Sequence, residues 1–171
     1  MDGMTRLTRH LMTLSVVVAC IGWAASVASA QAPIDVYDLA DYRLTPPVFE
    51  QFVQASGRIA EITRHDPAFT YAPLFTKDVA LSGDAPAMAA GLVARLENHT
   101  GLSAALDTAK LTPREYAKFA IVLLAAHVAH GFVKAGVLQR VPAGAPASNV
   151  EFVKAREAEV TAVLAELGVR D

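Results

Sequence analysis

The sequence has very little cysteine and tryptophan. Cys20 and Trp23 are the single residues of each type among 171, and both lie close to the N-terminus. One thiol cannot form a disulfide within the chain, and covalent c-type haem is excluded because it requires a Cys-x-x-Cys-His motif. The fold must therefore be held together by core packing, without a disulfide. A domain of about 140 residues can bury enough surface for this.

A strong charge of either sign is also missing. The formal net charge is −2, and Lys and Arg (15) nearly balance Asp and Glu (17). No run of like charges offers a basic surface for nucleic acid. The chain also lacks a G-x-S-x-G nucleophile motif and a Gly-rich phosphate loop. We therefore expect no nucleic-acid partner, and an enzyme has little support.

The first thirty residues have the order of a secretory signal peptide. Arg6 and Arg9 form a positive start, an apolar run covers residues 11–19, and small residues follow up to Ala28-Ser29-Ala30. This order ends in an A-x-A cleavage site. We predict cleavage after Ala30, which leaves a single domain of residues 31–171 in the periplasm or outside the cell. Cleavage removes two arginines and one aspartate, so the formal net charge changes from −2 to −3.

Two other interpretations of this segment stay open. Residues 17–20, Val-Val-Ala-Cys, resemble a loose lipoprotein box in which Cys20 would be acylated. Residues 11–27 could instead stay uncleaved as a signal anchor, although Gly22, Trp23 and Ser26 interrupt a stretch that should hold about twenty apolar residues. The mature chain itself is expected to have no stable membrane span.

The rest of the chain has the periodicity of helices. Apolar residues recur at steps of three and four, and no segment of useful length shows the alternation of a strand. Helix starts are expected at Thr45-Pro46-Pro47, at Asp84, and at two capping boxes, Thr112/Glu115 and Ser148/Glu151. Helix ends are expected near His65 and at three glycines: Gly101 as a left-handed cap, Gly136 and Gly168. The predicted helices cover residues 46–64, 84–100, 113–135 and 149–167, with a possible short helix at 102–110. We therefore predict an all-α fold, a single irregular four-helix bundle with 113–135 as its central helix.

A connection with aromatic content joins the first two predicted helices. Residues 66–83 contain Phe69, Tyr71 and Phe75. A connection of this length is often functional, and a helical bundle can open a cleft for an apolar ligand. Together with Tyr116 of the central helix, these three aromatic residues form the predicted ligand pocket.

Histidines offer a second candidate site. His127 and His130 lie on one face of the central helix, and Glu157 interrupts the otherwise apolar seam of the last one. These three residues could hold a metal ion, or the histidines could face a haem. A hydrogen-bonded pair in or near the core explains the two histidines without any ligand. His65 and His99 fall at predicted helix ends, where the helix dipole favours a partly charged imidazole.

Two segments of the C-terminal half carry a resemblance. LTPREYAKFAIVLLAAHVAHGF and SNVEFVKAREAEVTAVLAEL resemble a group of secreted bacterial proteins of unknown function. The resemblance concerns helix starts and packing positions and carries no catalytic residues. It implies an exported helical domain.

These observations favour an exported protein of the bacterial envelope that binds rather than catalyses. Its expected partner is a small apolar ligand or an envelope protein. The alternative is a metal- or haem-binding bundle using His127 and His130. An enzyme is the third hypothesis, and its minimum would be His127 as a general acid or base beside Glu157. The sequence identifies no cofactor.

Overall fold

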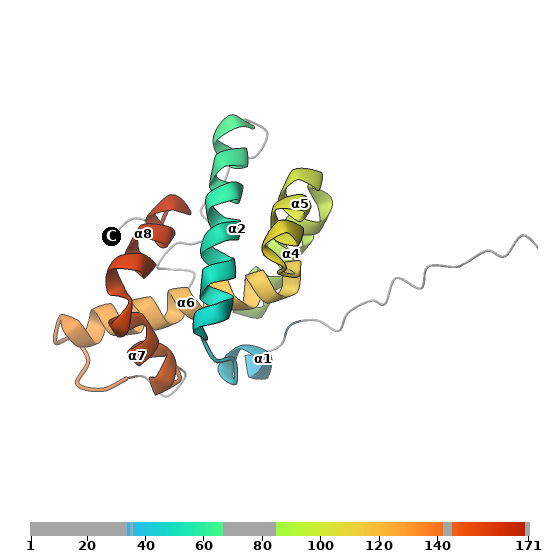
Figure 1. Ribbon diagram of the computed structural model, residues 1–171. Coiled ribbons are helices and arrows are strands. Elements are labelled where there is room, and N and C mark those ends of the chain that lie inside the picture. Colours follow the sequence, from blue (N-terminus) through green and yellow to red (C-terminus); the bar gives the residue numbers. More distant parts are fainter. Residues whose placement is uncertain (1–33, 35, 67–84, 142–144, 170–171) are drawn as a thin grey trace, which may run out of the picture. The chain divides into compact units, whose positions relative to one another are not determined.

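The computed structural model describes residues 34, 36–66, 85–141 and 145–169 (Figure 1). These residues contain seven helices and no strand, so the all-α prediction is confirmed for the described part of the chain. The helices are α1 (Val36–Ala40), α2 (Pro46–His65), α4 (Ala85–Asn98), α5 (Thr100–Ala109), α6 (Pro113–Lys134), α7 (Ala147–Ala155) and α8 (Glu157–Glu166).

Helix α6 is the central element, as its sequence predicts. The Thr112 hydroxyl accepts a hydrogen bond from the backbone N–H of Glu115 at 3.1 Å, and Pro113 is the first helical residue. Between Phe119 and Ala129 nearly every side chain is buried. Among the described helices, α6 alone is long and apolar enough to cross a membrane, yet 61% of its most apolar stretch is buried inside the domain. Such burial is typical of a core helix that is apolar on all sides.

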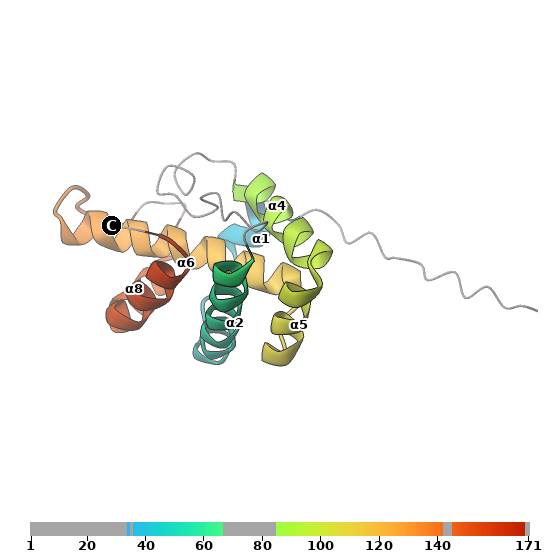
Figure 2. The ribbon, with the colours of Figure 1, turned by 90° about the horizontal axis from the view of Figure 1, so that it is seen from above.

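The other helices pack around α6. Helices α8, α2 and α5 lie side by side and α6 runs across them (Figure 2), with α2 contacting both of its neighbours. Helices α4 and α7 also pack on α6. One apolar core joins all seven helices; its largest fully buried members include Phe52, Ile59, Leu106, Phe119 and Leu164.

The prediction of one continuous last helix is wrong. The backbone leaves helical geometry at Arg156 (φ −128°, ψ 29°), which separates α7 from α8. Helix α7, with the buried Val153, packs on α6, whereas α8, with the buried Val160, packs on α2. A straight helix cannot follow both partners, because α2 and α6 run in different directions.

The expected helix caps are formed in part. Gly136 (φ +72°) and Gly168 (φ +86°) adopt the left-handed conformation that ends a helix. Thr45 has the extended geometry of an N-cap but makes no side-chain cap bond. Ser148 is not a cap either, since α7 already begins at Ala147.

The boundary between α4 and α5 also differs from the prediction. Gly101 is not a left-handed cap but lies inside α5, because the chain leaves helical geometry at His99 and starts a new helix at once. His99 was expected at the C-terminal end of a helix, but it is the N-cap residue of α5. Its Nδ1 accepts the backbone N–H of Leu102 at 3.3 Å, and its Nε2 lies 3.3 Å from Asp66. His99 therefore caps the start of α5 and links it to the end of α2.

Candidate functional site

The structure brings one of the two candidate histidines to the candidate glutamate. His130 is 91% buried on α6, and its Nε2 lies 3.5 Å from Oε2 of Glu157. Lys134, one turn later on α6, donates a hydrogen bond to Oε1 of the same carboxylate at 2.5 Å. The break at Arg156 makes this contact possible, since it places Glu157 at the first residue of α8, where the helix dipole also favours a negative charge.

This contact holds Glu157 in its ionised form. The hydrogen bond from Lys134 lowers the pKa of the Glu157 carboxyl below its usual value, and the neighbouring His130 acts in the same direction. A carboxyl with a lowered pKa stabilises the folded state at pH values above its ordinary pKa. That contribution is lost as the pH falls through the lowered value.

We therefore expect Glu157→Gln to lower stability slightly at pH 7 and to have a smaller effect below about pH 4. The effect should be small because the carboxylate is partly exposed to solvent. Urea unfolding of both proteins at pH 7, 5 and 3.5 would measure it. Glu159→Gln, an exposed change on the same helix, is the matched control. A Glu157→Gln effect that is equal at pH 7 and pH 3.5 would contradict the assignment.

His127, the third residue of the predicted metal site, does not share the contact between His130 and Glu157. His127 is half-buried on α6, one turn before His130. In the residues that the structure describes, no three or more His, Cys, Asp or Glu side chains are grouped so that they could hold a metal ion. Both carboxylate oxygens of Glu157 lie against side chains of α6, one of them a lysine ammonium. Metal or haem binding by His127 and His130 stays a prediction.

The predicted aromatic pocket lies mostly outside the described residues. Phe69, Tyr71 and Phe75 belong to residues 67–84, which the structure does not describe. Tyr116 has no exposed surface: its ring stacks on Phe52 at 4.8 Å, and its hydroxyl lies 3.0 Å from that of Ser56. In the described structure Tyr116 is therefore a core residue with a satisfied hydroxyl.

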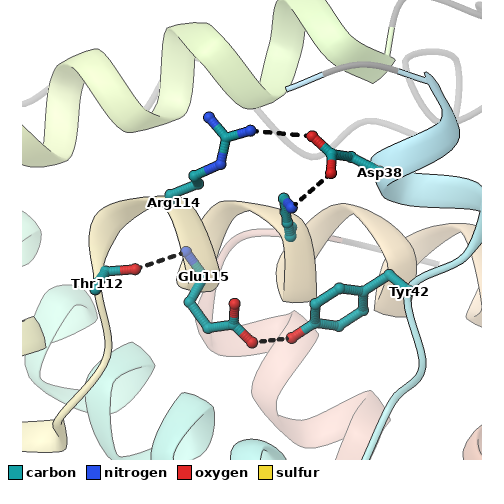
Figure 3. Close-up of polar contacts among 6 residues, drawn as sticks. Asp38, Tyr42, Thr112, Arg114 and Glu115 are labelled. Carbon is teal, nitrogen blue, oxygen red and sulfur yellow. Dashed lines mark hydrogen bonds and ion pairs between the residues drawn. The ribbon is translucent and has the colours of Figure 1, made fainter. Parts of the chain in front are cut away.

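A polar cluster that sequence analysis missed lies at the start of α6 (Figure 3). The Asp38 carboxylate, on α1, accepts hydrogen bonds from Arg114 at 3.0 Å and from Lys118 at 3.1 Å. The Tyr42 hydroxyl donates to the Glu115 carboxylate at 2.5 Å. Burial raises the pKa of the Tyr42 phenol far above its ordinary value, and Glu115 raises it further, so the phenol remains a donor. The cluster ties the segment that precedes α2 to α6.

A buried amide completes this attachment. Asn149, 1% exposed near the start of α7, accepts the Leu44 backbone N–H at 3.0 Å and donates to the Tyr42 carbonyl at 2.9 Å. The two segments that carry the resemblance contain Arg114, Glu115 and Asn149. In the sequence these segments indicated only where helices start. The partners of these three residues lie more than 70 positions away, and no local spacing reveals such a distance.

Shallow hollows on the described surface include three that lie between or beside the helices. One of about 260 Å³ lies between α2 and α5 and is lined by residues such as Arg58, Ile62 and Ala105. A second of about 110 Å³ lies between α2 and α8, and a third of about 300 Å³ includes His99. All are at or below the lower end of the range of small-molecule pockets, roughly 300–1,000 Å³.

Comparison with known proteins does not identify this arrangement. No protein-family model matches the chain, and neither a curated protein nor a solved structure matches it.

Proposed function

We propose that this chain is an exported bacterial envelope protein and that its domain, residues 31–171, is a non-catalytic binding module. The signal peptide is residues 1–30, with cleavage after Ala30. The bound species is a small apolar ligand or an envelope protein. The mature domain is periplasmic or secreted and is an irregular helical bundle.

The order of residues 1–30, with a positive start, an apolar run and an A-x-A site, supports the export part of this proposal, and the place of the core in the sequence is compatible with it. Ile34 is 4% exposed and belongs to the core, and the proposed cleavage site lies just before it in the sequence. Cleavage after Ala30 would therefore leave the whole described core in the mature chain, including the segment that Asp38 and Tyr42 attach to α6. A cut a few residues further along would remove a core side chain.

The proposal of a binding module, rather than an enzyme, is supported by the structural roles of three carboxylates. The carboxylates of Asp38, Glu115 and Glu157 all serve contacts between separate elements of the domain. These contacts give the acids a structural role. The hollow between α2 and α5 offers apolar contact through Ile62 and Ala105, beside the charged side chains of Arg58 and Glu61 at the same hollow.

Native mass spectrometry of untagged protein from the bacterial envelope tests both parts. We expect a mature mass that begins at Gln31, together with a bound lipid-like mass or a co-purifying protein. An Ala30→Arg variant, which destroys the A-x-A site, should remain at the precursor mass. A precursor found in the cytoplasm would refute export, and acylation at Cys20 would replace cleavage by a lipid anchor. A bound metal or haem lost in His127→Ala/His130→Ala would favour the alternative function.

A further inference from the structure

One face of α2 is open along its length. Glu50, Val53, Gly57, Glu61 and Arg64 recur at steps of three and four, and all are exposed. Val53 is 38% exposed, one of two large apolar side chains exposed among the described residues. Helix α2 contacts α5, α6 and α8 with its other sides (Figure 2). Residues at these steps form one stripe on a helix surface.

The centre of this stripe is a glycine that the described fold does not require. Gly57 has no left-handed backbone angle, and a Cβ atom added to it would approach only the Glu166 carboxylate, at 4.0 Å. Glycine lowers helix stability relative to alanine. Its lack of a side chain does, however, let a second helix come close to α2 at this point.

Charges are placed symmetrically about Gly57, with opposite sign. Glu50 lies seven residues before it and Arg64 seven residues after it, each about 10 Å away along the helix axis. In the described part of the chain neither side chain forms an ion pair within the domain. If two copies of α2 cross antiparallel at Gly57, Glu50 of each copy meets Arg64 of the other, and the two-fold axis produces this pair twice.

We propose that this face of α2 binds a second copy of the chain, with the two helices antiparallel and crossing at Gly57. Val53 then packs against the aliphatic stem of the partner's Glu61, next to the ion pair. One pair of helices of 20 residues is a small contact beside the roughly 1,200–2,000 Å² of standard stable interfaces. The dimer is therefore reversible and forms at micromolar or higher concentration.

Charge reversal tests the register of this interface. Glu50→Arg and Arg64→Glu each replace two attractions with two repulsions and should weaken dimerisation about tenfold, as measured by sedimentation velocity over a concentration series. The double variant Glu50→Arg/Arg64→Glu restores opposite charges and should recover the affinity of the natural protein. Gly57→Gln should remove the dimer without unfolding the monomer, because the site has room within the domain.

Controls separate association from folding. Glu97→Arg reverses an exposed charge on α4 and should leave the dimer unchanged, and circular dichroism should show native helix content in every variant. The protein measured is the mature chain of the proposed function, residues 31–171. A monomer at every concentration up to 500 μM would overturn the proposal. The proposal would also be overturned if neither single charge reversal changed the dimerisation affinity. The same holds if the double variant dimerised more weakly than either single variant.

Discussion

Replacing Phe52 by alanine is expected to lower the free energy of unfolding by about 3–5 kcal/mol. The Phe52 side chain is fully buried, and its ring lies 4.8 Å from that of Tyr116 and 5.0 Å from that of Phe119. Truncation removes this aromatic contact and leaves a cavity between α2 and α6. Because domains are stable by only about 5–15 kcal/mol, the loss would be a large part of the total.

Val53→Ala is the matched control for this substitution. Val53 follows Phe52 on α2 but faces solvent, so its truncation should change stability by less than about 1 kcal/mol. Urea unfolding followed by circular dichroism, at a concentration where the protein is monomeric, measures both variants. Equal losses for the two would mean that the packing of α2 on α6 is wrong.

Asn149→Ala is expected to lower the free energy of unfolding by about 2–4 kcal/mol, although it removes little apolar surface. The amide satisfies the Leu44 backbone N–H and the Tyr42 carbonyl. Leaving a buried backbone group unpaired costs about 1–3 kcal/mol. The segment before α2 should then detach from α7 more readily, and amide hydrogen exchange around Leu44 should become faster.

The neighbouring residue provides the control for Asn149. Ser148→Ala changes an exposed side chain that does not cap α7, and we expect a change within about 0.5 kcal/mol. Asn149→Asp keeps an acceptor for Leu44 but places a carboxylate against the Tyr42 carbonyl, so it should not restore stability. Unchanged hydrogen exchange at Leu44 in Asn149→Ala would show that the attachment does not depend on this amide.

Much of the secondary structure could be predicted because its causes are local. Thr112 followed by Pro113 sets the start of α6, and the apolar run after Phe119 places it in the core. Steps of three and four residues identified α2, whose expected end near His65 agrees with the structure. Gly136 and Gly168 were correctly read as helix ends, since a positive φ costs glycine little.

Local sequence patterns predicted the candidate site less well than the helices. Glu157 was singled out in the sequence because it interrupts an apolar seam, and its role as a metal ligand stays a prediction. Its contact with Lys134 and His130 depends on the break at Arg156, which periodicity alone does not reveal. Tyr116 was predicted to line a ligand pocket with Phe69, Tyr71 and Phe75; in the described residues its ring is fully buried and stacks on Phe52 of α2.

The sequence by itself determined the all-helical character of the described residues, the central place of α6 and several helix boundaries. Only the tertiary structure decided that Asp38 meets Arg114, that Asn149 holds Leu44, and that the last helix is divided. Periodicity and capping act within a few residues, so they can be read along the chain. The partner of a polar side chain, and the direction in which a helix must run, depend on how distant segments pack together.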